Sequence, residues 1–234
     1  MLAKVLLAAI EIAAEAAAGA RGERRASATV HGEGDDGSWS IAVESAAGGD
    51  APLRHAMTGA LDRGGFLAEG RVVPGGEGLW LAAGALGFKL GPFAITARGK
   101  LSHLGSAGLR GAGARVDWEH ELSESTRAGI GAEAWALWLS KGFRGDPWLG
   151  YGQRTLDWSQ RGSLSGWLAH DFGILSAAPS LEIVLPPKVG AVEARLAASL
   201  EVPLGSWKLR AQAAVSWAAV WLYEAGAGLA RSWP

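Results

Sequence analysis

Two segments near the C-terminal end of the chain alternate apolar and other residues almost without error. Between Val192 and Val202, and again between Trp207 and Trp217, every second residue is apolar, and the positions between them hold charged, polar or small residues. Because successive side chains of a strand point to opposite faces, each segment predicts a strand with one purely apolar face. The length of about eleven residues, with Trp at the ends of the second apolar stripe, is typical of a strand that crosses a membrane.

Similar patterns recur along the chain between short breaks rich in Gly, Ser and Pro. Fourteen segments are candidate strands: 24–31, 38–47, 53–61, 66–73, 79–90, 93–103, 108–122, 126–139, 148–158, 163–172, 180–185, 192–202, 207–217 and 223–233. Pro179, Pro186 and Pro187 crowd the segment 180–185, and proline fits poorly inside a closed sheet. We therefore expect about twelve strands, with ten to fourteen allowed, and an even number places both chain ends on the same side.

The first 23 residues have a different pattern. Met1–Ala20 is rich in Ala, has Lys4 near its start, and ends in small residues before the charged run Arg21–Arg25. This order is typical of a secretory signal peptide with its cleavage site. The alternative is an Ala-rich helix whose polar side carries Glu11 and Glu15. The chain thus divides into residues 1–23, a signal peptide or a short helix, and residues 24–234.

Composition and motifs argue against several classes of protein. The chain has no cysteine, so disulfides, thiolate metal sites and cysteine nucleophiles are excluded. Its formal net charge of −1 gives no indication of a nucleic-acid partner. The five histidines lie far apart, so we expect no metal site. His170 and Asp171 are neighbours in a predicted strand and would point to opposite faces, so we expect no enzyme and no cofactor.

Residues 24–233 resemble the bacterial outer-membrane β-barrel proteins. The resemblance lies in the two-residue alternation, in the Trp residues near strand ends, and in a last strand where Leu229 and Trp233 share a face. It implies an all-β fold: a closed, antiparallel, up-and-down transmembrane barrel in the bacterial outer membrane. The lipid bilayer is then the main partner, and proteins of the cell envelope are further candidates.

The polar faces of the predicted strands carry both signs of charge. An open barrel would use them as a polar pore lining, whereas a filled one would join them into a salt-bridge network between adjacent strands. The balanced sign predicts no strong preference for anions or cations. The residues expected to line the lumen are Arg98, Lys100, Arg115, Asp117, Glu119, Arg127, Glu133, Glu193, Arg195, Glu201, Lys208 and Arg210.

The chain contains 12 Trp residues, and many lie near predicted strand ends. Such positions are typical of the aromatic belts at membrane–water interfaces, although core packing and sugar stacking are alternatives. We expect Trp39, Trp118, Trp138, Trp148, Trp158, Trp207, Trp217 and Trp233 at the membrane interface.

These features favour a passive channel, or small-solute porin, with a mixed-charge lumen. The alternative is a non-conducting barrel that anchors an envelope assembly. A membrane-embedded hydrolase and a soluble β-sandwich or lipocalin-like barrel are two further hypotheses. The soluble barrel would put charges on both strand faces, and the apolar faces of 192–202 and 207–217 have none.

Overall fold

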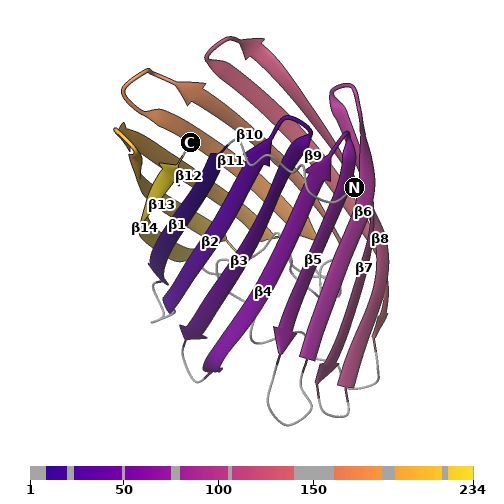
Figure 1. Ribbon diagram of the computed structural model, residues 1–234. Coiled ribbons are helices and arrows are strands. Elements are labelled where there is room, and N and C mark those ends of the chain that lie inside the picture. Colours follow the sequence, from indigo (N-terminus) through magenta and orange to yellow (C-terminus); the bar gives the residue numbers. More distant parts are fainter. Residues whose placement is uncertain are drawn as a thin grey trace, which may run out of the picture.

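A computed structural model of the chain describes residues 9–19, 24–48, 51–74, 80–104, 107–139, 161–185, 193–217 and 221–233. These residues form a single closed barrel of antiparallel strands (Figure 1). No helix that is long and apolar enough to cross a membrane occurs among them. The all-β class and the closed antiparallel barrel are therefore confirmed.

The barrel has fourteen described strands, each hydrogen-bonded to its neighbours in sequence. Their bounds are β1 Ala9–Gly19, β2 Arg24–Gly34, β3 Gly37–Gly48, β4 Ala51–Arg63, β5 Phe66–Pro74, β6 Trp80–Leu90, β7 Phe93–Leu104, β8 Ala107–Ser123, β9 Thr126–Leu139, β10 Gly162–Asp171, β11 Ser176–Leu185, β12 Glu193–Leu204, β13 Trp207–Trp217 and β14 Trp221–Trp233.

The barrel closes between its first and last strands. Strand β1 pairs with β2 on one side and with β14 on the other, where Ile10 lies opposite Trp233. Figure 1 shows the indigo strand β1 beside the yellow strand β14. Closure pairs the backbone of every strand on both sides, and a sheet can span a membrane only under this condition.

Alternation along each strand separates an outer face from an inner one. In β7, Thr96 and Lys100 on the inner face are buried, whereas Ile95 and Leu101 on the outer face are 46% and 39% exposed. In β6, the outward Leu86 and Phe88 are about three-fifths exposed. The outer surface is thus built largely from exposed aliphatic and aromatic side chains. Such a surface suits lipid hydrocarbon and far exceeds the apolar patches that soluble monomers tolerate.

One rim of the barrel carries tight turns. Two-residue turns at 35–36, 64–65, 91–92, 124–125 and 205–206 join successive strands there, and residues 172–175 join β10 to β11. Gly64 and Gly65 both have positive φ angles, of 57° and 83°, which is the backbone that a tight two-residue hairpin requires. Ala9 pairs with Glu33 beside the turn at 35–36, so β1 begins at this same rim. Strand β14 ends there too, because Trp233 pairs with Ile10. We call it the short-turn rim.

The structure corrects the expectation for the N-terminal segment. Ala9–Gly19 forms strand β1 rather than a helix, and it pairs along its length with both neighbours. Alanine favours helices in isolation, but propensity is a weak prior that tertiary pairing overrides. Here the pairing supplies backbone partners on both sides. The signal peptide stays a prediction, and cleavage after Ala20 would remove this strand.

Two further differences concern the number of strands. The segment that we set aside for its prolines is the ordered strand β11. Pro179 pairs in register with Ala198 of β12, while the ladder with β10 is interrupted between Trp167–Ser180 and His170–Ala177. The missing N–H of Pro179 therefore falls where that ladder is already broken, and the strand continues. The segment 148–158, expected as a strand, lies outside the described residues.

Candidate functional site: the lumen

The inner face of the barrel holds the charged side chains. The structure places Arg98, Lys100, Arg115, Asp117, Glu119, Arg127, Glu133, Arg195, Glu201, Lys208 and Arg210 on this face, where most of them are buried or half-buried. Glu193 begins β12 at a position of the same face, and its side chain lies outside the described residues. The alternation of the sequence thus carries over into a polar lumen wall.

Many of the ion pairs on this wall bridge strands that are not neighbours. Arg98 of β7 lies 3.4 Å from Glu69 of β5, and Ala85 of the intervening strand β6 is in register with both. Arg98 also pairs with Glu133 of β9, passing over Gly113 of β8. In both cases the strand between the two charges presents a residue with little or no side chain, so the long guanidinium reaches across it.

A second chain of charges runs along the wall from β12 through β14 and β2 to β5. Arg25 of β2 pairs with Glu224 of β14 at 2.9 Å across β1, and Arg195 of β12 reaches the same carboxylate at 3.4 Å across β13. Glu44 of β3 lies 3.8 Å from Arg25 and 3.7 Å from Arg71 of β5. One carboxylate thus holds two arginines, and the charges alternate along the wall from β12 to β5.

A third cluster surrounds Arg210 of β13. Its guanidinium lies 2.8 Å from Glu201 of β12, 2.6 Å from Glu11 of β1 and 3.7 Å from Glu15 of β1. Lys208 adds contacts of 2.9 Å to Glu11 and 3.5 Å to Glu201. The cluster spans four strands of the wall, and β14 passes beneath it.

These contacts change the expected pattern of pairing. Adjacent strands do pair charges at Glu201–Arg210 and at Arg127–Glu119, where the atoms lie 3.6 Å apart. Many of the other pairs skip one strand. The physical reason is the length of the arginine side chain together with the small residues of the skipped strands. None of the ion pairs named here joins strands more than two places apart around the barrel, so these pairs lie along the wall rather than across the lumen.

Several lumen residues were missing from the sequence prediction. Glu11 and Glu15 were assigned to an N-terminal helix or signal, although their spacing of four residues also puts them on one face of a strand. Trp135 was also missed. It lies on the inner face, donates a hydrogen bond to Glu133 and has the ammonium of Lys100 3.8 Å from its ring centre. Further charged residues of the wall were left out of the prediction: Arg25, Glu44, Glu69, Arg71, Glu182 and Glu224.

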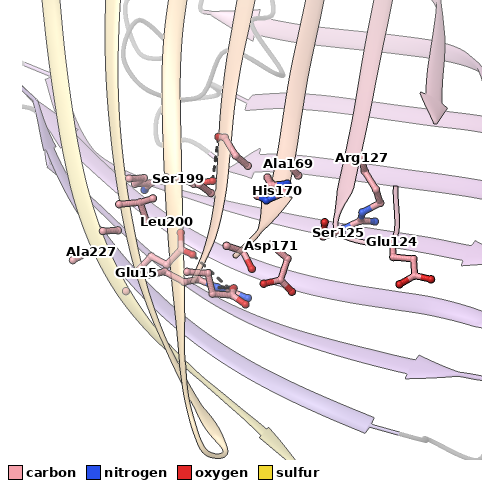
Figure 2. A pocket seen from close by; sticks show the side chains of 18 residues that line it. Glu15, Glu124, Ser125, Arg127, Ala169, His170, Asp171, Ser199, Leu200 and Ala227 are labelled. Atoms are coloured by element: carbon pink, nitrogen blue, oxygen red, sulfur yellow. Dashed lines mark hydrogen bonds and ion pairs between the residues drawn. The ribbon is translucent and has the colours of Figure 1, made fainter. Parts of the chain in front are cut away.

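The lumen is hollow toward the short-turn rim. A cavity of about 530 Å³ lies there, and eight strands or turns contribute to its lining. Figure 2 shows Glu15, Arg127 and Asp171 around it. His170 and Thr126 share a hydrogen bond of 2.8 Å, while Asp171 accepts one of 2.7 Å from the backbone of Gly173. The side chains of His170 and Asp171 therefore make separate local contacts and do not contact each other. Among the described residues no cluster of His, Asp and Glu could hold a metal ion.

Toward the opposite rim, some side chains of the inner face are almost completely buried. The inward-facing Leu109 of β8 and Val184 of β11 are 0% and 1% exposed, and Ser163 of β10 is also buried. Apolar side chains that faced open water in a wide pore would be exposed. These inner-face side chains are therefore shielded from solvent, in contrast to the open cavity at the short-turn rim.

Six of the eight predicted interfacial Trp residues are described, and they lie on the outer face near the two rims. Trp207 follows directly after a tight turn, and Trp118 lies opposite Phe93, the first residue after another. Trp39 and Trp233 also lie near this short-turn rim, whereas Trp138 and Trp217 lie near the opposite rim. Trp148 and Trp158 are outside the described residues.

Comparisons with known proteins agree with this geometry at the level of fold. No family model and no curated protein sequence matches the chain. Solved structures do match. The Acinetobacter baumannii outer membrane protein Omp33 is 9% identical, with a TM-score of 0.57 over 96% of this chain and 97% of that one. An anion-selective porin from Comamonas acidovorans is 6% identical, with a TM-score of 0.53 over 96% and 98%.

A third match, a KdgM porin, is 11% identical, with a TM-score of 0.52 over 96% of this chain and 99% of that one. All three matches span nearly the whole of both chains. At such low identity they show the fold alone. The chain therefore has the β-barrel fold of bacterial outer-membrane porins.

Proposed function

We propose that this chain is a bacterial outer-membrane channel that lets small hydrophilic solutes pass passively, without catalysis. The observation that carries the proposal is the course of the lumen ion pairs. Arg98, Arg25 and Arg210 find their partners one or two strands away along the wall, so these networks leave the centre of the barrel free. Short turns in such barrels face the periplasm, which puts the cavity of about 530 Å³ at the periplasmic mouth.

The distribution of charge supports a weak preference for cations. In the strands, the acidic side chains that the structure describes all lie on the inner face, whereas Arg24, Arg110 and Arg231 lie on the outer face. On the inner face of the described strands, carboxylates therefore outnumber cationic side chains. Charges that line a pore tune its ion preference, and carboxylates favour cations.

Planar-bilayer recording of the refolded protein tests the channel. We expect discrete conductance steps. In a KCl gradient, we expect the reversal potential to be shifted toward the equilibrium potential of K⁺. The matched variants are Ser199→Trp, which adds a ring inside the periplasmic cavity, and Ala198→Trp, which adds the same ring to the outer face. The first should lower the unit conductance, and the second should leave it unchanged.

A wild-type protein that folds but stays electrically silent would overturn the channel. It would favour the non-conducting barrel that anchors other envelope proteins. Conductance that both Trp variants lower equally would also count against passage through the lumen.

A further inference from the structure

A row of glycines crosses the outer face of the barrel. Gly59, Gly70, Gly84 and Gly99 are in direct register across β4, β5, β6 and β7. A Cβ atom built at Gly70 or at Gly99 would have no atom within 4 Å. Large apolar side chains flank the row, such as Leu86, which is 60% exposed. The outer surface is therefore hollowed along this row.

At one end of the row the surface forms a groove of about 500 Å³. Its outward-facing lining consists of Ala82, Gly84, Gly99, Leu101, Arg110 and Trp138. With the exception of Arg110, these residues offer only small, aliphatic or aromatic surface. The outward-facing lining of the groove is thus apolar apart from one cation, while Lys100, which also borders the groove, has its side chain on the inner face.

Arg110 is unusual for its place on the barrel. It pairs in register with Leu101 of β7 and Trp138 of β9, whose side chains are 39% and 60% exposed on the outer face. The described acidic residues of the strands all lie on the inner face, so the described wall offers Arg110 no carboxylate. A lipid-facing arginine is unfavourable at the middle of a membrane and tolerated near its surface.

The position of Arg110 agrees with the membrane surface. It is the fourth residue of β8, roughly 10 Å along the strand from its start, at the rim opposite the short turns. Trp138 is the last residue but one of β9, at the same rim. Exposed Trp side chains settle at the level of the lipid headgroups, which places the neighbouring guanidinium among the phosphates.

We propose that this groove binds an anionic, phosphate-bearing lipid of the surrounding membrane leaflet. Its phosphate lies on the guanidinium of Arg110, and one acyl chain lies over Gly84 and Gly99. A guanidinium offers two parallel N–H donors that match a phosphate, and the phosphate supplies the negative charge that the outer wall lacks. The glycines supply the room for the chain, since their side of the wall is open. The site is independent of whether the lumen conducts.

Native mass spectrometry of the folded barrel tests the site. The protein in a neutral detergent receives equal amounts of phosphatidylglycerol and phosphatidylcholine with identical acyl chains. We expect the wild type to retain the anionic lipid about tenfold better, the range of one charge-assisted hydrogen-bonded contact. Arg110→Gln should abolish the difference, and Gly99→Leu should lower the retention of both lipids by filling the trough.

Arg24→Gln is the control, because Arg24 also faces outward but lies on β2, away from the groove. Equal retention of the two lipids by the wild type would overturn the proposal. So would an unchanged preference in Arg110→Gln, or the same loss in Arg24→Gln. A wild-type dimer that Gly99→Leu dissociates, with lipid retention unaltered, would assign the groove to a second copy of the chain instead. Should Arg110→Gln fail to fold, Gly99→Leu alone decides, since its added side chain meets open space.

Discussion

Arg210 reaches Glu11 across an entire strand: its Nη2 lies 2.6 Å from the Oε1 of Glu11, and β14 runs between them. Gly228 of β14 is in register with both Arg210 and Glu15, so no side chain stands between that second pair, whose atoms lie 3.7 Å apart. Because β1 and β14 are the strands that close the barrel, this cluster ties β13 to β1 across the seam. The ion pair and the glycine form one structural unit.

The first prediction concerns Gly228. A Cβ atom at this position would lie 2.5 Å from the Cγ of Glu15 and 2.8 Å from the carbonyl oxygen of Ala14. Gly228→Val should therefore displace Glu15 and lower the free energy of unfolding by about 1–3 kcal/mol, the usual effect of overpacking. Urea unfolding in detergent measures the change. Gly70→Val, in open space on the outer face, is the control, and equal losses would show that Gly228 has no special role.

The second prediction concerns the charge of Arg210. Arg210→Met leaves Glu11, Glu15 and Glu201 close together, with only Lys208 to compensate. We expect a loss of about 1–3 kcal/mol in the free energy of unfolding, because half-buried carboxylates lose a hydrogen-bonded cation. Urea unfolding of the wild type and the variant in detergent measures the loss.

Arg127→Met is the matched control for that experiment. Arg127 and its partner Glu119 have side chains that are 59% and 54% exposed, and such pairs contribute about 0–1 kcal/mol. A loss for Arg210→Met no larger than that for Arg127→Met would contradict the role of the three carboxylates. Changing Arg195, Lys208 and Arg210 together to Glu should prevent folding altogether, because Glu224 would lose one of its two arginines as well.

The third prediction tests which face meets lipid. Ala211 and Gln212 are neighbours in the middle of β13 and point to opposite faces of the wall. Ala211→Arg should lower the free energy of unfolding in liposomes by about 2–4 kcal/mol, because it puts a charge in hydrocarbon. Gln212→Arg should have little effect, since it faces the lumen. Similar losses for the two variants would disprove the assignment of the faces.

The fourth prediction concerns the N-terminal strand. Strand β1 pairs with both β2 and β14, so a chain that begins at residue 20 would have two unpaired edges in place of a closed sheet. We expect the protein isolated from outer membranes to retain Ala9–Gly19, and a chain without residues 1–19 to fail to form a heat-resistant barrel. Intact mass measurement and the gel mobility of unheated samples test both points. A folded, membrane-inserted protein that starts at residue 21 would refute the expectation.

The alternation of single strands was readable from the sequence because the direction of a side chain in a strand is a local property. Lys208 and Arg210 needed only their own neighbours to be placed on the inner face. The strand-skipping contacts were not readable, because Arg98 meets Glu69 only through the register of three strands around a closed wall. β1 was missed because runs of alanine favour a helix until two strands pair with them. β11 was set aside because the sequence does not reveal that Pro179 falls at a gap in the ladder.

The last prediction links the charge of the lumen to ion preference. Glu119 and Glu121 lie on the inner face of β8, both are exposed, and Glu119 makes only a loose ion pair of 3.6 Å with Arg127. Exposed carboxylates attract cations without supporting the fold, so Glu119→Gln with Glu121→Gln should move the reversal potential in a KCl gradient toward that of Cl⁻. The free energy of unfolding should stay within about 1 kcal/mol of the wild type. The matched change on the outer face, Arg24→Gln, should leave the reversal potential where it was. A pore that is selective for anions before any change, or a reversal potential that the double variant does not move, would refute the excess of carboxylates as the source of ion preference.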